Sequence, residues 1–84
     1  MTKIFKLYGW MLADRDASMA FRDFEKLLRA FGFEHVRTTG SHRQYRHPLV
    51  PEILSIQPRG NQAKSYQLRQ FVDMTETYGL TMGE

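Results

Sequence analysis

Two of the three histidines in this chain, His42 and His47, lie in one short arginine-rich segment. Residues 38–48 read TTGSHRQYRHP. Free imidazole titrates near pH ~6.5, so a histidine can give or take a proton near neutral pH. A neighbouring arginine can hold a phosphate through two parallel hydrogen bonds and stabilise negative charge that develops on it. Together these residue types favour cleavage of a phosphodiester in RNA, which carries its own nucleophile, the 2′-hydroxyl, and needs no metal.

Several residues of this segment have predicted roles in catalysis or substrate binding. We expect His42 to be the catalytic acid or base, with Arg43 and Arg46 binding phosphate. Gly40 would let the backbone approach the substrate closely. The amides around Ser41 would form a small anion-binding nest. Spacing alone favours a solvated surface or simple nucleic-acid binding over catalysis.

His47 is the candidate for a second proton carrier, because one histidine cannot easily serve as both acid and base. Water is the alternative proton carrier. Because His47 directly precedes a proline, it also fits a structural role at the end of the strand. A metal site would require His35, His42 and His47 to converge. Two of these three are predicted on opposite faces of one strand, with no acidic residue nearby. We therefore expect no metal and no other cofactor.

The composition describes a small single domain of 84 residues without cysteine. A domain of this size buries only about 60% of its unfolded surface, which leaves no room for a buried cofactor cavity. The lack of cysteine excludes disulfides and thiolate metal sites and fits a reducing compartment. No stretch approaches the roughly 20 apolar residues of a membrane span. The sequence thus predicts a soluble cytoplasmic protein with no membrane contact.

Positive charge gathers in the middle of the chain. The formal net charge is +3, from 12 basic and 9 acidic residues. Between residues 37 and 64 the only acidic residue is Glu52. The basic residues there are Arg37, Arg43, Arg46, Arg59 and Lys64. A basic region of this kind is typical of proteins that bind nucleic acid, and Arg37, Lys64 and Arg59 are further candidates for RNA contacts.

Two amphipathic helices are predicted, over residues 18–31 and 65–78. Apolar residues recur at three- and four-residue spacing in both. Gly32 and Gly79 should end them. Ser18 or Asp16 is expected to cap the first helix and Ser65 the second. The residues expected to dominate the core are Phe21, Phe24, Leu28, Phe31, Leu68 and Phe71.

Three short strands are predicted between the helices, over residues 33–38, 42–47 and 53–57, with a proline-bounded loop before the third. They are too close together for helical crossovers, so the sheet should be antiparallel. The fold class is α+β, with both helices on one face of the sheet. Alternation places His42, Gln44 and Arg46 on the open face, and Tyr45 under the helices with Arg43 and His47. Residues 1–16 precede this unit; residues 3–8 fit a strand, whereas residues 7–12 fit a helical turn.

This order of motifs resembles the HicA family of toxin-antitoxin ribonucleases. The resemblance covers roughly residues 18–80 and is carried by the first helix with its glycine, by Gly40-Ser41-His42, by Tyr45 and by His47-Pro48. It implies a fold similar to the double-stranded RNA-binding domain over residues 18–84, with residues 1–17 as an N-terminal extension.

The same resemblance implies a function. The chain would be the toxin of a type II toxin-antitoxin system, an mRNA interferase. It would cleave mRNA with His42 as the catalytic histidine and so inhibit translation and growth. Its partner would be a HicB-type antitoxin.

Two other functions remain open. The chain could be an RNA-binding module of the same fold without cleavage, because A-form RNA is recognised through shape, phosphates and 2′-hydroxyls. It could also be an interaction protein that docks on a partner through residues 1–16. Incubation with RNA in the presence of a chelator separates the first alternative from the enzyme.

Overall fold

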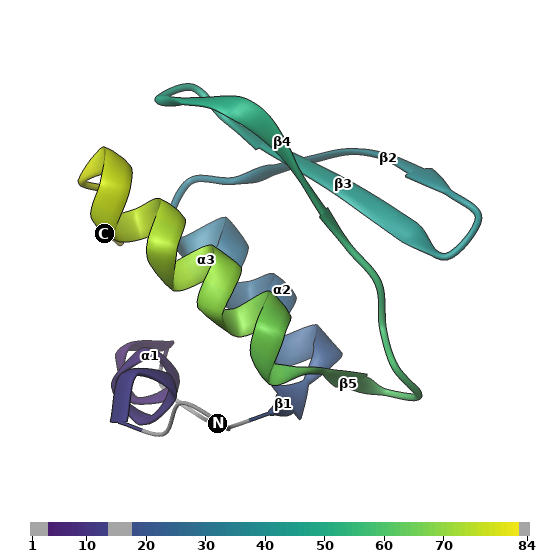
Figure 1. Cartoon of the computed structure of the whole chain (residues 1–84), viewed down its shortest axis with the longest axis horizontal. Coiled ribbons are helices and arrows are strands. Elements are labelled where there is room, and N and C mark those ends of the chain that lie inside the picture. Colours follow the sequence, from purple (N-terminus) through teal and green to yellow (C-terminus); the bar gives the residue numbers. More distant parts are fainter. Residues whose placement is uncertain (1–3, 14–17, 83–84) are drawn as a thin grey trace.

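The computed structural model describes residues 4–13 and 18–82. Its elements are the helices α1 (Ile4–Ala13), α2 (Phe21–Ala30) and α3 (Ser65–Tyr78) and the strands β1 (Met19–Ala20), β2 (Glu34–Thr39), β3 (His42–His47), β4 (Val50–Ile56) and β5 (Gln62–Ala63). Strands β2, β3 and β4 form an antiparallel sheet in that order. Helices α2 and α3 lie side by side on one face of this sheet, and no described element covers the other face (Figure 1). We call the uncovered side the open face.

This arrangement confirms the predicted α+β class and the fold similar to the double-stranded RNA-binding domain. The predicted core is also confirmed, because all six expected core residues and Tyr45 are buried. Phe71 of α3 lies at its centre. Its ring meets those of Phe24 and Phe31 edge-on, at centroid distances of 5.7 and 5.1 Å. Such edge-to-face pairs add to the burial of apolar area and hold the two helices together.

The third strand begins earlier than predicted. β4 starts at Val50, which pairs with His47, so only Pro48 and Leu49 form the turn. The expectation of a proline-bounded loop over residues 48–51 is wrong, because Val50 and Pro51 belong to β4. Pro51 is tolerated within β4 because this strand lies at the edge of the sheet, where a missing amide donor need not break the ladder.

The helix ends agree with the glycines, but the caps do not agree with the predicted side chains. Gly79 adopts a left-handed conformation with φ 62° and ends α3. Ala20, not Ser18, is the N-cap of α2, and the amide of Phe21 donates to the carbonyl of Asn61 at 2.8 Å. The Ser18 hydroxyl instead donates to Oε1 of Gln62. Asp16, the alternative cap, lies outside the described residues.

The cap predicted for α3 is also wrong. Ser65 is the first residue within α3, and Lys64 is its N-cap without a side-chain hydrogen bond. The two-residue strands β1 and β5, which pair with each other next to this helix start, were not predicted. Strands of this length are too short to leave an alternating pattern in the sequence.

The N-terminal segment is a helix, so the strand alternative for residues 3–8 is wrong over its described part. α1 lies on the side of the helix pair that faces away from the sheet (Figure 1). The ring of Tyr8 packs against Phe31 at 4.9 Å and Phe71 at 6.2 Å. Its hydroxyl donates to Oγ1 of Thr75 at 3.0 Å, since the Thr75 hydroxyl itself donates to the carbonyl of Val72. Within the described chain, no helix is both long and apolar enough to cross a membrane.

Candidate functional site

The β2–β3 hairpin turn lies at the edge of the molecule (Figure 1), and His42 is the first residue of β3 after it. Thr39 and His42 are cross-strand partners, so Gly40 and Ser41 alone form the turn. A positive φ of 60° at Gly40 and none at Ser41 is the pattern of a type II′ turn, which matches the twist of the strands that flank it. No atom lies within 4 Å of the position that a Cβ of Gly40 would take. The backbone of the turn is therefore open to approach, and His42 next to it is exposed.

Contacts on the two faces of β3 confirm the predicted alternation. Tyr45 is fully buried, Arg43 reaches Glu25 of α2, and His47 reaches the carbonyl of Phe31 at the end of α2. These three side chains lie on the helix side. His42 and Gln44 alternate with them and lie on the open face.

Arg37 shares the open face with His42. It lies opposite Gln44 in the ladder, and its Nε donates to Oε1 of Gln44 at 3.3 Å. Gln44 is two residues from His42, so Arg37 lies diagonally across from the histidine on the next strand. Side chains in this relation are about 7–8 Å apart, within reach of a long side chain.

Arg46 is exposed farther along β3. Its guanidinium lies 3.9 Å from Glu34, and both side chains are largely in solvent. An exposed pair at this separation contributes little and is easily exchanged. Four residues along a strand span ~13 Å. Arg46 therefore lies ~13 Å along β3 from His42.

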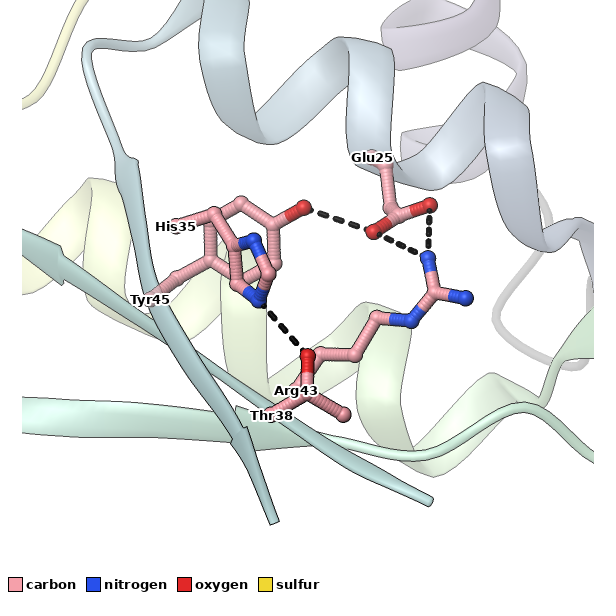
Figure 2. A network of polar contacts seen from close by, with 5 residues as sticks. All are labelled: Glu25, His35, Thr38, Arg43 and Tyr45. Atoms are coloured by element: carbon pink, nitrogen blue, oxygen red, sulfur yellow. Dashed lines mark hydrogen bonds and ion pairs between the residues drawn. The ribbon is translucent and has the colours of Figure 1, made fainter. Parts of the chain in front are cut away.

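Arg43 does not share the open face with His42. Its Nη1 donates to both carboxylate oxygens of Glu25 at 2.8 Å (Figure 2). Its guanidinium also lies over the ring of Phe21, 5.2 Å from the centroid. Arg43 is thus held on the helix side by two residues of α2, although its side chain stays 41% exposed.

Glu25 is a buried acid that the sequence analysis did not identify. It is 7% exposed and accepts a 2.6 Å hydrogen bond from the hydroxyl of Tyr45 (Figure 2). Burial raises the pKa of Glu25, but hydrogen bonds from Tyr45 and Arg43 and the charge of Arg43 outweigh it, and the pKa lies below its usual value. Burial and the Glu25 bond raise the pKa of Tyr45 to about 12. A signal was present, because Glu25 lies four residues after Phe21 on the apolar stripe of the helix.

His47 uses both ring nitrogens on the main chain. Nε2 lies 2.9 Å from the carbonyl of Phe31 and therefore donates, and Nδ1 accepts from the amide of Leu49 at 3.0 Å. Its ring also packs edge-on against Phe33. Five residues along a strand separate it from His42 by ~16 Å, and it points to the opposite side. This geometry gives His47 a structural position at the end of β3.

The remaining predicted residues lie away from the hairpin turn. His35 packs against the ring of Tyr45 at 5.2 Å and shares a hydrogen bond with Thr38 on the helix side (Figure 2). Lys64 is exposed at the N-cap of α3, and Arg59 is exposed in the turn before β5. Within residues 4–13 and 18–82, no group of three histidine, cysteine, aspartate or glutamate side chains is arranged to hold a metal ion.

Comparison with known families identifies this arrangement. A model of the HicA toxin of bacterial toxin-antitoxin systems matches residues 21–76, well over half of the chain. The chain belongs to the HicA toxin family. The match runs from the first residue of α2 into the last turns of α3 and includes the hairpin with Gly40, Ser41 and His42. Helix α1 precedes the part that matches the HicA family. Comparisons with curated proteins and with solved structures gave no match.

Proposed function

We propose that this HicA-family toxin is a metal-independent endoribonuclease that cleaves mRNA, with His42 as its general acid or base. The observation that supports this most directly is the exposure of His42 beside an open turn, on the sheet face that no described element covers. A polynucleotide can reach an imidazole in this position. An imidazole buried under α2 and α3 would be out of reach of the RNA.

The proposed reaction uses groups that the RNA supplies itself. The 2′-hydroxyl attacks the adjacent phosphorus, the bond from phosphorus to the 5′-oxygen breaks, and a 2′,3′-cyclic phosphate and a free 5′-hydroxyl result. His42 removes the proton from the 2′-hydroxyl or gives one to the leaving oxygen. Water carries the other proton. His47 is not available for this step, because both of its ring nitrogens form hydrogen bonds with the main chain and lie on the helix side of the sheet.

The groups around His42 have proposed roles in binding the substrate. Arg37 holds the scissile phosphate and stabilises its developing charge. The amides at Gly40 and Ser41 bind one of its free oxygens. Arg46 and Lys64 contact phosphates farther along the RNA.

The proposed role in the cell follows from the family. Cleavage of mRNA in the cytoplasm would stop translation and growth. A HicB-type antitoxin would neutralise the toxin by covering the open face.

The test compares His42→Ala with His35→Ala, which makes the same change on the other face of the sheet. Purified proteins are incubated with RNA in the presence of a chelator, and the fragments are resolved. We expect the wild type and His35→Ala to cleave and His42→Ala to leave the RNA intact with an unchanged fold. Cleavage by His42→Ala at the wild-type rate contradicts the assignment of His42. Wild-type protein that leaves the RNA intact in this assay, but binds it in a separate gel-shift measurement, indicates the non-catalytic RNA-binding module instead.

A further inference from the structure

A groove opens on the helix side of the sheet, beside Arg43, which directly follows His42 in the chain. Its volume is ≈ 570 Å³. Residues 20–22 at the start of α2 form one wall, and Pro58 with the turn at Gly60 and Asn61 forms another. Glu25 and Arg43 line it as well. The groove lies outside the proposed catalytic face, and the roles under the proposed function do not use it.

Arg43 presents part of its guanidinium to this groove in a fixed orientation. Its Nη1 donates to both carboxylate oxygens of Glu25 (Figure 2), and its guanidinium forms no other hydrogen bond within the described residues. Nε and Nη2 keep their donors for a ligand. Glu25 and the ring of Phe21 prevent the group from turning away. An arginine oriented in advance binds a phosphate with two hydrogen bonds and loses little side-chain entropy on binding.

The charge balance of the groove favours an anion. The carboxylate of Glu25 is already neutralised by Arg43 and accepts a bond from Tyr45. Arg22 is exposed and forms no ion pair within the described residues, so the side chains that line the groove have a net formal charge of +1, from Arg22 and Arg43 against Glu25. The turn at Gly60 leaves the approach open, since no atom lies within 4 Å of where its Cβ would be.

We propose that this groove binds a phosphate of the substrate RNA next to the phosphate at His42, through Arg43 and Arg22. This inference rests on the proposed function and extends it to a second subsite. His42 and Arg43 are consecutive and point to opposite faces at the hairpin end of the sheet. An RNA strand that passes around this end meets the histidine on one face and the groove on the other. Glu25 is the positioning residue that holds Arg43 for this contact.

The test measures RNA binding in a chain that cannot cut. In the His42→Ala background, Arg22→Ala is compared with Arg69→Ala, an exposed arginine of α3 that does not line the groove. Both changes remove one positive charge from a helix surface. The affinity for a short single-stranded RNA is measured at several salt concentrations. Each phosphate contact contributes about 0.7 to the slope of log K against log salt.

We expect Arg22→Ala to weaken RNA binding several-fold and to reduce this slope by about 0.7, with Arg69→Ala at the parent value. Equal behaviour of the two variants overturns the subsite. Poly-glutamate serves as a second probe. If Arg22→Ala weakens binding of poly-glutamate but not of RNA, the groove takes an acidic protein segment and the proposal is wrong.

A further variant tests whether the guanidinium of Arg43 makes two parallel hydrogen bonds to phosphate. Arg43→Lys keeps the charge but cannot make two parallel hydrogen bonds to phosphate. We expect weaker RNA binding with the parent salt slope, after thermal unfolding has shown that the variant is folded. Parent affinity in folded Arg43→Lys contradicts the proposed phosphate contact. A separate outcome is that the wild-type protein leaves RNA uncut while Arg22→Ala still reduces the salt slope as expected. That combination supports the subsite and contradicts only the proposed catalysis.

Discussion

The hydroxyl of Tyr45 donates a 2.6 Å hydrogen bond to Oε2 of Glu25, across the interface between β3 and α2. Because Tyr45 is fully buried and Glu25 nearly so, this bond joins the sheet to the helix layer where water does not compete. It also fixes the carboxylate that holds Arg43. The bond therefore connects the stability of the domain to the groove next to His42.

Tyr45→Phe should destabilise the protein although it retains the ring. The change removes a hydrogen bond to a charged group, which contributes about 1.5–3 kcal/mol. The free energy of unfolding is measured in urea. Tyr78→Phe is the matched control, since Tyr78 donates a similar bond to Glu52 at the surface, and its loss should have little effect. Equal stability of Tyr45→Phe and the wild type would show that the buried bond is unimportant.

Acid should weaken the fold through Glu25. The pKa of Glu25 in the folded chain lies below the reference value of 4.5. Folding therefore favours the ionised form. Its contribution is complete above pH 4.5 and is lost as the pH falls through the lower folded pKa. Unfolding is measured over an acid pH series for the wild type and for Glu25→Gln. The variant should lose less stability than the wild type over this range, and an identical acid dependence would exclude Glu25 as the source.

His47→Ala should lower stability without changing the chemistry. The variant leaves the carbonyl of Phe31 and the amide of Leu49 without their partner, which costs about 1–3 kcal/mol. We expect a lower melting temperature and an RNA cleavage rate whose pH profile keeps the wild-type shape. The rate is measured well below the melting temperature. Loss of one limb of the pH profile would instead identify His47 as a proton carrier.

Helix α1 should stabilise the family domain through Tyr8. Tyr8→Ala removes the ring that contacts Phe31 and Phe71 and the hydrogen bond to Thr75. Tyr8 is only half-buried, so we expect a loss of about 2 kcal/mol, below the ~3–5 kcal/mol of a fully buried aromatic. Trp10→Ala is the control on the same helix, because Trp10 is 45% exposed. A larger loss in Trp10→Ala than in Tyr8→Ala, measured by urea unfolding, would contradict this packing.

The sequence by itself determined the features that depend on local backbone geometry. The alternation of β3 placed His42 and Tyr45 on opposite faces, because the side-chain period of a strand is two residues. The apolar stripes predicted α2 and α3, and Gly79 predicted where α3 ends, because a left-handed residue favours glycine. These signals lie within a few neighbouring residues.

Tertiary structure alone decided the features that depend on residues far apart in the chain. Arg43 pairs with Glu25, Phe21 is capped by the carbonyl of Asn61, and Tyr8 donates to Thr75. In each case several donors or acceptors were available in the sequence. The choice among them was made by the packing of helices on the sheet, since a buried polar group must take the partner that the packing brings within reach. His42 was therefore found from its segment, whereas the neighbouring groove and the residues that orient Arg43 appear only in the folded chain.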